Sequence, residues 1–423
     1  MYSPPVKGAN MTRQSIADVE VHGRKVLLRM DLNVPIEEDQ VLDDTNLRLA
    51  LPTIRNILDR GGRLIIIAHL GLPEGHGYEA DLTLKPCARR LSELLHRPVP
   101  LAPDCIGPVV REMVERLNNG DVLMLENLRF HEEEILNSEP FARELAALGD
   151  VYCNEALGVS HRRHGSIDAL PRLMATCPRV AGLQLWRELL ALKSICQHPL
   201  RPAVLVIGGR RMEDKIPAVV GLRDRVDTVL IGGEIALSFL AAERKSIGRT
   251  EIEPRFIMEA QHALEAAVCS HARVMLPEDH VCAKEISAMA DSHVFPEVIP
   301  EGWLGMDIGP RTVVAYAEVI RHARTVFWTG PMGAWETKPF DVGTKMVALA
   351  TAHAALINHA QVVAAGGSLR LALERFGLER SMTHVTAGGA ATLALLQGKP
   401  LPGISVLDRP VEHPQELVSH GTH

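Results

Sequence analysis

Short apolar segments that end near a glycine, each followed by a helical pattern, recur along the chain. Residues 202–209 (PAVLVIGG) show the apolar segment, and residues 47–62 (LRLALPTIRNILDRGG) show the helical one, with apolar side chains on one face. Apolar strands that alternate with helices are typical of parallel sheets covered on both faces. The pattern therefore predicts an α/β fold that binds ligands at the carboxyl ends of its strands, where the glycines fall. Further segments of this kind lie at 26–35, 64–71, 121–130, 227–240, 272–281, 324–333 and 360–367.

The loops that follow these segments differ between the two halves of the chain. Before about residue 185 they carry ionisable side chains, which suit a small anion, and after about residue 200 they carry glycine pairs, which suit a phosphate or a flat base. The amphipathic segment 181–198 is followed by two prolines and predicts a helix between two domains. We expect an N-terminal domain over 1–185, an interdomain helix over 186–200, a C-terminal domain over 201–400 and a C-terminal segment over 401–423.

Composition excludes several classes of protein. The formal net charge is −7 and no basic cluster occurs, which argues against binding to nucleic acid or to an anionic membrane. Apolar runs such as 64–68 are too short to span a bilayer, and the N-terminus lacks the apolar core of a secretory signal. The seven cysteines are widely spaced without a CxxC motif, so we expect buried thiols in a reducing cytoplasm and neither disulfides nor a zinc site.

The common nucleotide-binding motifs do not occur in the sequence. There is neither a GxxxxGK[ST] motif nor a GxGxxG after a strand, which excludes a P-loop NTPase and a classical dinucleotide site. The paired HRD and DFG motifs of protein kinases do not occur either.

A longer series of motifs, in collinear order over about residues 12–407, closely resembles the phosphoglycerate kinase family. The series is VLLRMDLNVP, LDDTNLRLALPTI, HLGLP, LAPDCIG, LENLRFHEEE, GDVYCNEALGVSHRRHGS, DKI, WLGMDIGP, GPMGAWE and HVTAGGAATLALLQGKPLPG. The resemblance implies two Rossmann-like domains with parallel sheets, joined by a helix, and a chain that returns toward the first domain after residue 400.

The resemblance also implies an activity. Members of the family transfer a phosphoryl group reversibly between Mg-ATP and 3-phosphoglycerate, giving 1,3-bisphosphoglycerate and ADP, in glycolysis or carbon fixation. Such transfer depends on positioning and on neutralising charge rather than on covalent chemistry. A cytoplasmic monomer is expected, with Mg²⁺ carried by the nucleotide and no metal ligand assigned to the protein.

By resemblance, the first domain binds 3-phosphoglycerate. Asp31 and Asn33 are expected at the hydroxyl and carboxylate end of the substrate, and Arg48 beside the transferring phosphoryl group. Leu72 stands where the family has an arginine (HLGRP), which removes one cation near the substrate. Taken singly, Arg48 on a helix is more typical of an exposed surface residue. The residues expected to fix the substrate phosphate are His69, Arg129 and Arg162.

By the same resemblance, the second domain binds the nucleotide. Lys215 is expected both to bind it and, with Arg211, to take part in catalysis, although the family has a lysine where this chain has Arg211. The other expected nucleotide-binding residues are Gly305, Glu336, Gly366, Gly367, Ser368 and Leu369. Glu336 taken alone is typical of an ordinary surface carboxylate. Positions that depart from the family pattern around the nucleotide are Arg211, Glu234, Thr329, Ser368 and Leu369.

These departures leave three functions open. The first is an active phosphoglycerate kinase, the second a related binding or regulatory protein with weakened or lost catalysis, and the third a kinase with another phosphoryl donor or acceptor. Ser368 replaces an aspartate that serves the Mg²⁺-nucleotide, and a neutral hydroxyl is a poorer partner for a hard cation. The sequence also leaves open whether Met1 or Met11 is the start, and it predicts a loosely docked polar tail over 408–423.

Overall fold

The computed structural model describes residues 12–410 except 198, 269 and 387, and the side chains of 194–197 are also left undescribed. Both alternative starts, Met1 and Met11, and the tail from residue 411 onward therefore lie outside the described residues. The chain divides into two compact units. We call residues 12–190 with 402–410 the N-unit and residues 191–401 the C-unit. The division falls inside helix α7 (Leu183–Gln197), between Leu190 and Ala191.

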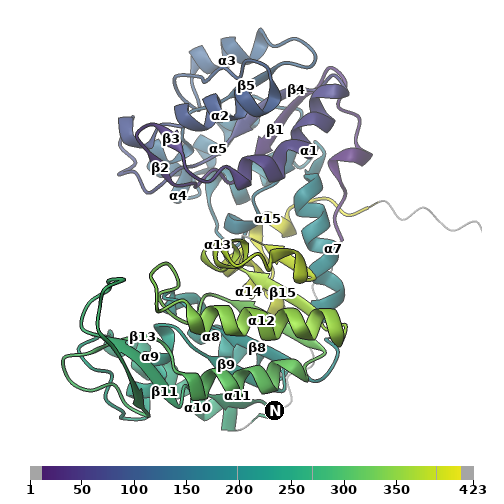
Figure 1. The fold of residues 1–423 in the computed structure, drawn as a ribbon. Coiled ribbons are helices and arrows are strands. Elements are labelled where there is room, and N and C mark those ends of the chain that lie inside the picture. The colour runs from purple at the N-terminus through teal and green to yellow at the C-terminus, as the bar shows by residue number, and fades with distance from the viewer. Residues whose placement is uncertain (1–11, 198, 269, 387, 411–423) are drawn as a thin grey trace, which may run out of the picture. The chain divides into compact units, whose positions relative to one another are not determined.

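The N-unit is built around a five-stranded parallel sheet with the strand order β5-β4-β1-β6-β7 (Figure 1). Its strands are β1 (Lys25–Arg29), β4 (Arg63–Ile67), β5 (Val122–Met124), β6 (Val151–Asn154) and β7 (Arg179–Ala181), and a small hairpin pairs β2 (Ile36–Glu37) with β3 (Gln40–Val41). Its helices are α1 (Thr45–Asp59), α2 (Lys85–Leu95), α3 (Pro108–Glu115), α4 (Glu132–Ile135), α5 (Glu139–Ala146), α6 (Leu170–Leu173) and α15 (Pro402–Ser405).

The C-unit contains a six-stranded parallel sheet with the order β10-β9-β8-β14-β15-β16. These strands are β8 (Ala203–Ile207), β9 (Thr228–Ile231), β10 (Arg273–Met275), β14 (Thr325–Thr329), β15 (Gln361–Ala365) and β16 (His384–Thr386). The helices are α8 (Met212–Leu222), α9 (Ile235–Ala242), α10 (Pro254–Val268), α11 (Pro310–Arg321), α12 (Val342–Ile357), α13 (Gly367–Arg375) and α14 (Gly389–Leu396).

The C-unit also has a second, antiparallel sheet that the sequence pattern does not predict. It has the order β12-β11-β13, with strands β11 (Asp279–Ala283), β12 (Ser292–Pro296) and β13 (Leu304–Ile308). The segment 272–281, which reads as one strand in the sequence, is divided between β10 and β11. Pro277 lies between them, where a residue without an N–H group cannot continue the pairing of β10.

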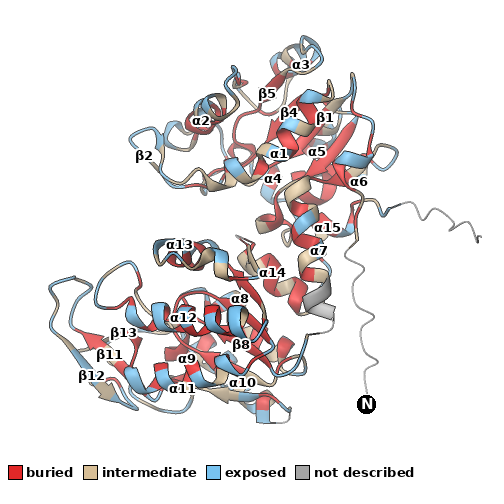
Figure 2. Ribbon diagram, turned by 45° about the vertical axis from the view of Figure 1, so that its right-hand side comes forward, coloured by how far each residue is buried: buried red, intermediate tan, exposed pale blue. Residues whose placement is uncertain are grey.

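Burial follows the pattern that the sequence predicts. All five residues of β8 and all five of β14 are buried, as expected for central strands with helices on both faces. Helix α1 is amphipathic and buries Leu47, Ala50, Ile54 and Leu58. Figure 2 shows buried residues concentrated in the strands and on the helix faces that cover them. None of the described helices is both long and apolar enough to cross a membrane.

The end of the described chain packs into the N-unit. The backbone N–H of Gln14 donates to the carbonyl of Asp408 at 2.9 Å, and Arg179 forms an ion pair with the Asp408 carboxylate at 2.6 Å. Asn154, at the end of β6, donates to the carbonyl of Gly403 at 2.9 Å. Residues 402–408 therefore complete a unit that begins with the first described residues.

Glu155 anchors the first turn of α7. Its carboxylate accepts the backbone N–H groups of Gln184 at 3.1 Å and Leu185 at 2.8 Å, which otherwise lack partners at a helix N-terminus. The hydroxyl of Thr53 also donates to this carboxylate and accepts the N–H of Leu183 at 2.8 Å. Burial raises the pKa of Glu155 to about 7, against the lowering effect of these hydrogen bonds.

Glu155→Gln is expected to weaken the pH dependence of stability between about pH 4.5 and 7. A carboxyl whose pKa is raised in the folded state contributes stability below its unfolded pKa, and this contribution is lost as the pH rises through its folded pKa. The variant removes that loss, which is of the order of 1–3 kcal/mol. Urea unfolding at pH 5 and pH 8 measures it, with the exposed Glu112→Gln as the matched control. An unchanged difference between the two pH values in Glu155→Gln would contradict the assignment.

Candidate active site

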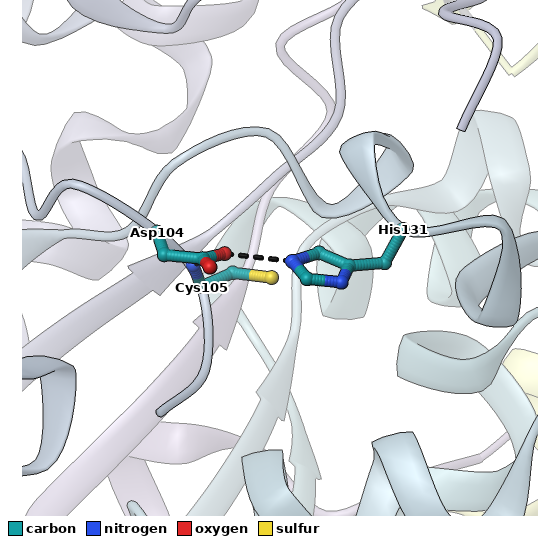
Figure 3. A group of neighbouring side chains, drawn as sticks. All are labelled: Asp104, Cys105 and His131. Carbon is teal, nitrogen blue, oxygen red and sulfur yellow. Dashed lines mark hydrogen bonds and ion pairs between the residues drawn. The ribbon is translucent and has the colours of Figure 1, made fainter. Parts of the chain in front are cut away.

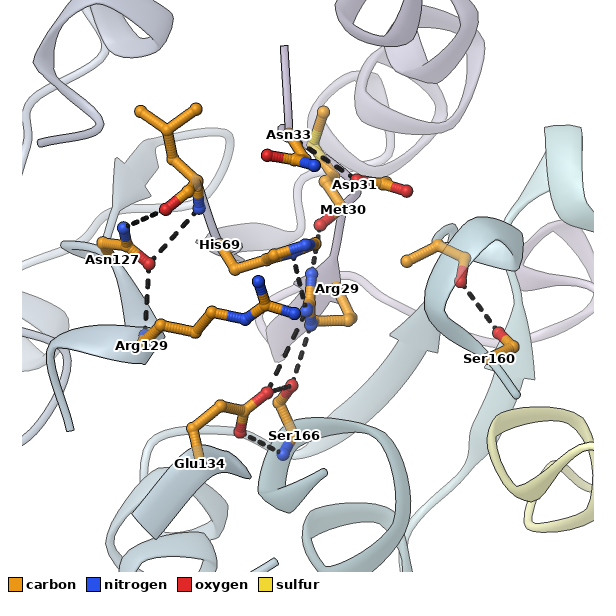
Figure 4. A network of polar contacts seen from close by, with 12 residues as sticks. Arg29, Met30, Asp31, Asn33, His69, Asn127, Arg129, Glu134, Ser160 and Ser166 are labelled. Atoms are coloured by element: carbon orange, nitrogen blue, oxygen red, sulfur yellow. Dashed lines mark hydrogen bonds and ion pairs between the residues drawn. The ribbon is translucent and has the colours of Figure 1, made fainter. Parts of the chain in front are cut away.

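Cationic side chains gather at the carboxyl ends of the N-unit strands, as Figure 4 shows for several of them. Arg29 is the last residue of β1, and His69 follows β4. Arg129 lies in the short helix η3 (Leu128–Phe130) after β5, and Arg162 follows β6. Because these strands are parallel, their carboxyl ends lie along one edge of the sheet. We call Arg29, His69, Arg129, Arg162 and His164 the anion cluster.

Arg29 forms the base of the anion cluster and is 1% exposed. Its Nε donates to Ser166 Oγ at 2.8 Å, another of its N–H groups donates to the carbonyl of Met30, and its Nη2 lies 3.1 Å from His69 Nδ1. Since a guanidinium has only donors, His69 Nδ1 accepts, and its ring proton is on Nε2. Burial, reinforced by the charge of Arg29, holds the pKa of His69 well below its usual value. His69 is therefore a neutral donor through Nε2.

Glu134 is the buried counter-charge of Arg29. Its Oε1 lies 4.0 Å from Arg29 Nη2, and neither side chain is more than 1% exposed. The carboxylate also accepts the backbone N–H of Ser166 at 2.7 Å and the Ser166 hydroxyl at 2.6 Å. Ser166 therefore bridges the two charged groups and fixes Arg29 beside His69.

Arg129 has a buried N–H group without a hydrogen-bond partner. Its Nη1 donates to the carbonyl of Gly71 at 2.6 Å, while its buried Nε has no hydrogen-bond partner. Burial and the charges of Arg162 and Arg29 lower the pKa of Arg129 to about 10. The pKa of His164 falls to about 4, through burial and then the charge of Arg129, and its buried Nδ1 also lacks a partner. Arginines that repel one another, with an unpaired N–H donor on Arg129, are what an anion would relieve.

Asp31 and Asn33 lie beside the anion cluster and supply oxygen acceptors. Asp31 Oδ1 accepts the N–H of Asn33 at 3.2 Å, and Asn33 Oδ1 accepts the N–H of Gly71 at 2.9 Å. Burial raises the pKa of Asp31, although Arg29, Arg129 and Arg162 act in the opposite direction. Gly158 permits this placement, because a Cβ there would lie 2.5 Å from Asp31 Oδ2. The structure thus brings five predicted substrate residues together.

Two predicted substrate residues are placed elsewhere. Arg48 is 54% exposed and pairs with Asp44 at 2.7 Å, one helical turn earlier. It lines a polar surface pocket with Arg89 and Arg90 of α2, and no interaction among the described residues joins it to the anion cluster. Leu72 is 78% exposed. Its neighbour Gly71 contacts Arg129 through its carbonyl, so the loop reaches the cluster through backbone and not through the leucine side chain.

In the C-unit, Lys215 is enclosed by glycine loops at the carboxyl ends of β8 and β14. The lysine, on α8, is 8% exposed, and its Nζ donates to the carbonyl of Gly208. Gly209 has a φ of +79°, and a Cβ there would lie 2.6 Å from Nζ. Burial and the charge of Arg211 lower the pKa of Lys215 to about 8. A desolvated ammonium group among bare backbone amides is suited to neutralising a phosphate.

Ser368 lies in the first turn of α13, directly after β15. Ser368 Oγ accepts the indole N–H of Trp335 at 3.0 Å. Leu369 is fully buried in the core of the C-unit, so only its backbone is available to a ligand. Gly366 has a φ of +113°, and a Cβ there would lie 4.0 Å from the Cα of Gly389, the first residue of α14. The exposed Gly367 begins α13.

The remaining predicted nucleotide-binding residues differ in how far they are exposed to solvent. Arg211 and Glu336 are exposed, and the carbonyl of Glu336 accepts a bond from Arg375 at 3.1 Å. Glu234 forms an ion pair with Arg210 at 2.8 Å, which offsets the negative charge that the sequence introduces there. Two further positions are Thr329, buried at the end of β14, and Gly305, which lies on β13 where a Cβ would meet Ile299 at 2.6 Å.

Sequence reasoning missed the residues that support the anion cluster. Arg29 reads as part of an apolar strand, and Glu134 and Ser166 lie in strongly polar segments (HEEE and SHRRHGS) in which nothing singles them out. The one available signal is an arginine at the end of a strand that is otherwise apolar. Asn127, between β5 and Arg129, was missed as well. Its side-chain oxygen accepts the N–H of Leu70 at 3.3 Å and its amide nitrogen donates to the carbonyl of Leu70 at 2.8 Å, which joins this segment to the loop after β4.

Comparison with known proteins places these features in a family. Residues 16–399 match the phosphoglycerate kinase family. The phosphoglycerate kinase of Chlorobaculum tepidum is 43% identical over 400 residues, which cover 94% of this chain and 100% of the relative, and that of Moorella thermoacetica is 41% identical over 398 residues, covering 94% and 99%. Two solved phosphoglycerate kinase structures are also similar: that from Coxiella burnetii has 32% identity and a TM-score of 0.77, and that from Pyrococcus horikoshii has 29% identity and a TM-score of 0.80. Each alignment covers 93% of this chain and 98% of the other chain. The chain belongs to the phosphoglycerate kinase family.

Proposed function

We propose that this protein transfers a phosphoryl group reversibly between Mg-ATP and 3-phosphoglycerate, giving ADP and 1,3-bisphosphoglycerate. The observation that carries the proposal is the anion cluster, in which Arg129 presents a buried Nε without a partner among cations that repel one another. A substrate with a phosphate and a carboxylate would satisfy these donors. The family membership supplies the reaction that such a substrate undergoes.

In the proposed complex, the N-unit holds the phosphoglycerate. Arg129 and Arg162 bind its phosphate as charged donors, and His69 adds the neutral Nε2–H donor that Arg29 orients. Asp31 and Asn33 accept from the hydroxyl group beside the carboxylate. Arg48 is proposed to stabilise the transferring phosphoryl group, which requires its guanidinium to leave Asp44.

The C-unit holds Mg-ATP in this proposal. Lys215 and Arg211 neutralise the phosphates, and the loops at Gly366, Gly367 and Ser368 supply backbone donors. Mg²⁺ arrives with the nucleotide and offsets the negative charge of its phosphates. Ser368 Oγ already accepts the indole N–H of Trp335, so position 368 would contribute little to holding Mg²⁺, and the nucleotide phosphates and water would supply its oxygen ligands.

A coupled assay with Mg-ATP and 3-phosphoglycerate tests the proposal on the full chain. Turnover above a protein-free blank is the expected result. Folded protein without turnover would overturn it, and calorimetry with Mg-ADP would then distinguish the alternatives. Loss of nucleotide binding would favour a binding or regulatory protein, whereas tight nucleotide binding would favour a kinase with another acceptor. A monomeric state, a cytoplasmic location and the pathway direction stay predictions.

Arg129→Ala is expected to raise KM for 3-phosphoglycerate by about 10- to 100-fold, with a much smaller change in KM for Mg-ATP. The reason is the loss of charge-assisted hydrogen bonds to the substrate phosphate, each worth about 1.5–3 kcal/mol. Steady-state kinetics with each substrate varied in turn measures the effect. Arg116→Ala, at an exposed arginine of the same unit, is the control and should leave both constants within twofold. Equal increases in both KM values would contradict the assigned role.

A further inference from the structure

We propose that Asp104, Cys105 and His131 form a binding site for a thiophilic divalent cation, with Zn²⁺ as the preferred ion. Figure 3 shows the three side chains converging from the loop before α3 and from the residue that precedes α4. Each residue offers one ligand atom, and the three ligand atoms lie within 4.8 Å of one another. No other group of three such residues meets this criterion among the described residues.

The three donor atoms lie near enough to one another for side-chain rotation to bring them around one zinc ion. Asp104 Oδ1 lies 2.7 Å from His131 Nε2 and forms a hydrogen bond with it. Ligand atoms around tetrahedral Zn²⁺, at bond lengths of about 2.0–2.3 Å, are separated by about 3.3–3.8 Å. The cation would replace the shared proton, and the carboxylate and imidazole would separate by less than about 1 Å. Side-chain rotation of the half-exposed Asp104 is enough for that movement.

The site is open to solvent on the carboxylate side and closed at the sulfur. Asp104 is 48% exposed, His131 is 24% exposed, and Cys105 is buried. A cation can therefore enter past the carboxylate and keep a water molecule as its fourth ligand. Glu133 adds negative charge near His131, whereas the charge of Glu134 is balanced by Arg29.

Cys105 is not a reactive thiol in the free protein, and a bound cation would have to displace protons from Cys105 and His131. The pKa of Asp104 is lowered and that of His131 raised, because each stabilises the charge of the other. Burial raises the pKa of Cys105 well above its usual value, so the free protein holds a thiol and not a nucleophilic thiolate. Binding of the cation would release this proton and the one on His131, as thiolate and imidazole ligation requires.

The surrounding contacts hold the ligands in place. The backbone N–H of Cys105 donates to Asp104 Oδ1 at 2.6 Å, which fixes the carboxylate beside the thiol. The ring of His131 packs against Phe141 with 5.4 Å between centroids. One sulfur, one nitrogen and one oxygen donor suit Zn²⁺, whereas Mg²⁺ and Ca²⁺ prefer oxygen ligands throughout.

Titration of the reduced, metal-free full chain with Co²⁺, followed by competition with Zn²⁺, tests the proposal. We expect one Co²⁺ per chain with a thiolate-to-cobalt charge-transfer absorption that Zn²⁺ abolishes. Cys105→Ser should remove this absorption and weaken Zn²⁺ binding by at least about 100-fold. Cys177→Ser, at a half-buried thiol outside the trio, is the matched control and should bind Co²⁺ like the parent protein.

Three results would overturn the proposal: no charge-transfer absorption in the parent protein, its survival in Cys105→Ser, or its loss in Cys177→Ser. Should Cys105→Ser not fold by circular dichroism, His131→Gln and Asp104→Asn decide the matter. Both are expected to weaken Zn²⁺ binding by at least about 10-fold, and binding within threefold of the parent in both would contradict the site. None of these readouts depends on kinase activity.

Discussion

Arg29→Ala is expected to lower the free energy of unfolding of the N-unit by about 3–5 kcal/mol. The substitution leaves Glu134, which is fully buried, without its counter-charge, and it removes the donors to Ser166 and His69. Breaking a buried pair from one side is costly because the remaining charge stays desolvated. Urea unfolding followed by fluorescence and circular dichroism measures the loss.

The control for Arg29 is Arg143→Ala, which breaks an exposed ion pair with Glu139 on α5 and should cost less than about 1 kcal/mol. The double variant Arg29→Ala/Glu134→Ala adds a second test. It should be more stable than the sum of the two single losses predicts, since neither charge is then left unpaired. Strict additivity would show that Arg29 and Glu134 do not act as a pair.

Lys215→Ala is expected to reduce turnover by about 10²–10³-fold while the fold is retained, given the proposed kinase activity. Its ammonium group is the buried cation at the carboxyl ends of β8 and β14, and of the two cations proposed to neutralise the phosphates from this unit, alanine would leave only the exposed Arg211. The assay is steady-state kinetics at saturating substrates. Lys399→Ala, at an exposed lysine of the same unit, serves as the control.

The pH profile gives the same prediction an independent check. With a pKa of about 8, Lys215 is charged below that value, so kcat/KM of the parent for Mg-ATP should fall as the pH rises through about 8. Lys215→Arg keeps its charge and should lack this decline, at a lower rate because the forked guanidinium does not fit a pocket built around a single Nζ. A decline that persists in Lys215→Arg would assign it to another group.

The α/β architecture could be predicted because strands buried on both faces consist of continuous runs of apolar residues, and such runs are visible in the sequence. The antiparallel sheet β12-β11-β13 could not, since its strands are partly exposed and β12 buries no residue completely. Segment 272–281 shows the limit clearly. Its composition changes from apolar (VML) to polar (PEDH), which is typical of a strand followed by a loop, whereas a second strand in fact begins at Asp279.

The candidate site was predictable where motif and strand end coincide. Asp31, Asn33, His69, Arg129 and Arg162 all follow strands of one parallel sheet, so topology alone brings them together. Arg48 differs because it lies on a helix, where the side chain's direction depends on which neighbour it pairs with, and here that neighbour is Asp44. The proposed cation site of Asp104, Cys105 and His131 has no sequence signature, because zinc motifs are defined by short spacings, whereas residues 105 and 131 are brought together by tertiary packing.

The return of residues 402–408 to the N-unit has a consequence for the order in which the protein is completed. Ser160, two residues before Arg162, accepts the N–H of Gly403 at 2.9 Å through its carbonyl and accepts from Asn154 through its hydroxyl at 3.0 Å. During synthesis, the N-unit therefore cannot form the hydrogen bond between Ser160 and Gly403 until all of residues 191–401 have been made. The half of the protein that emerges first is the half that is finished last.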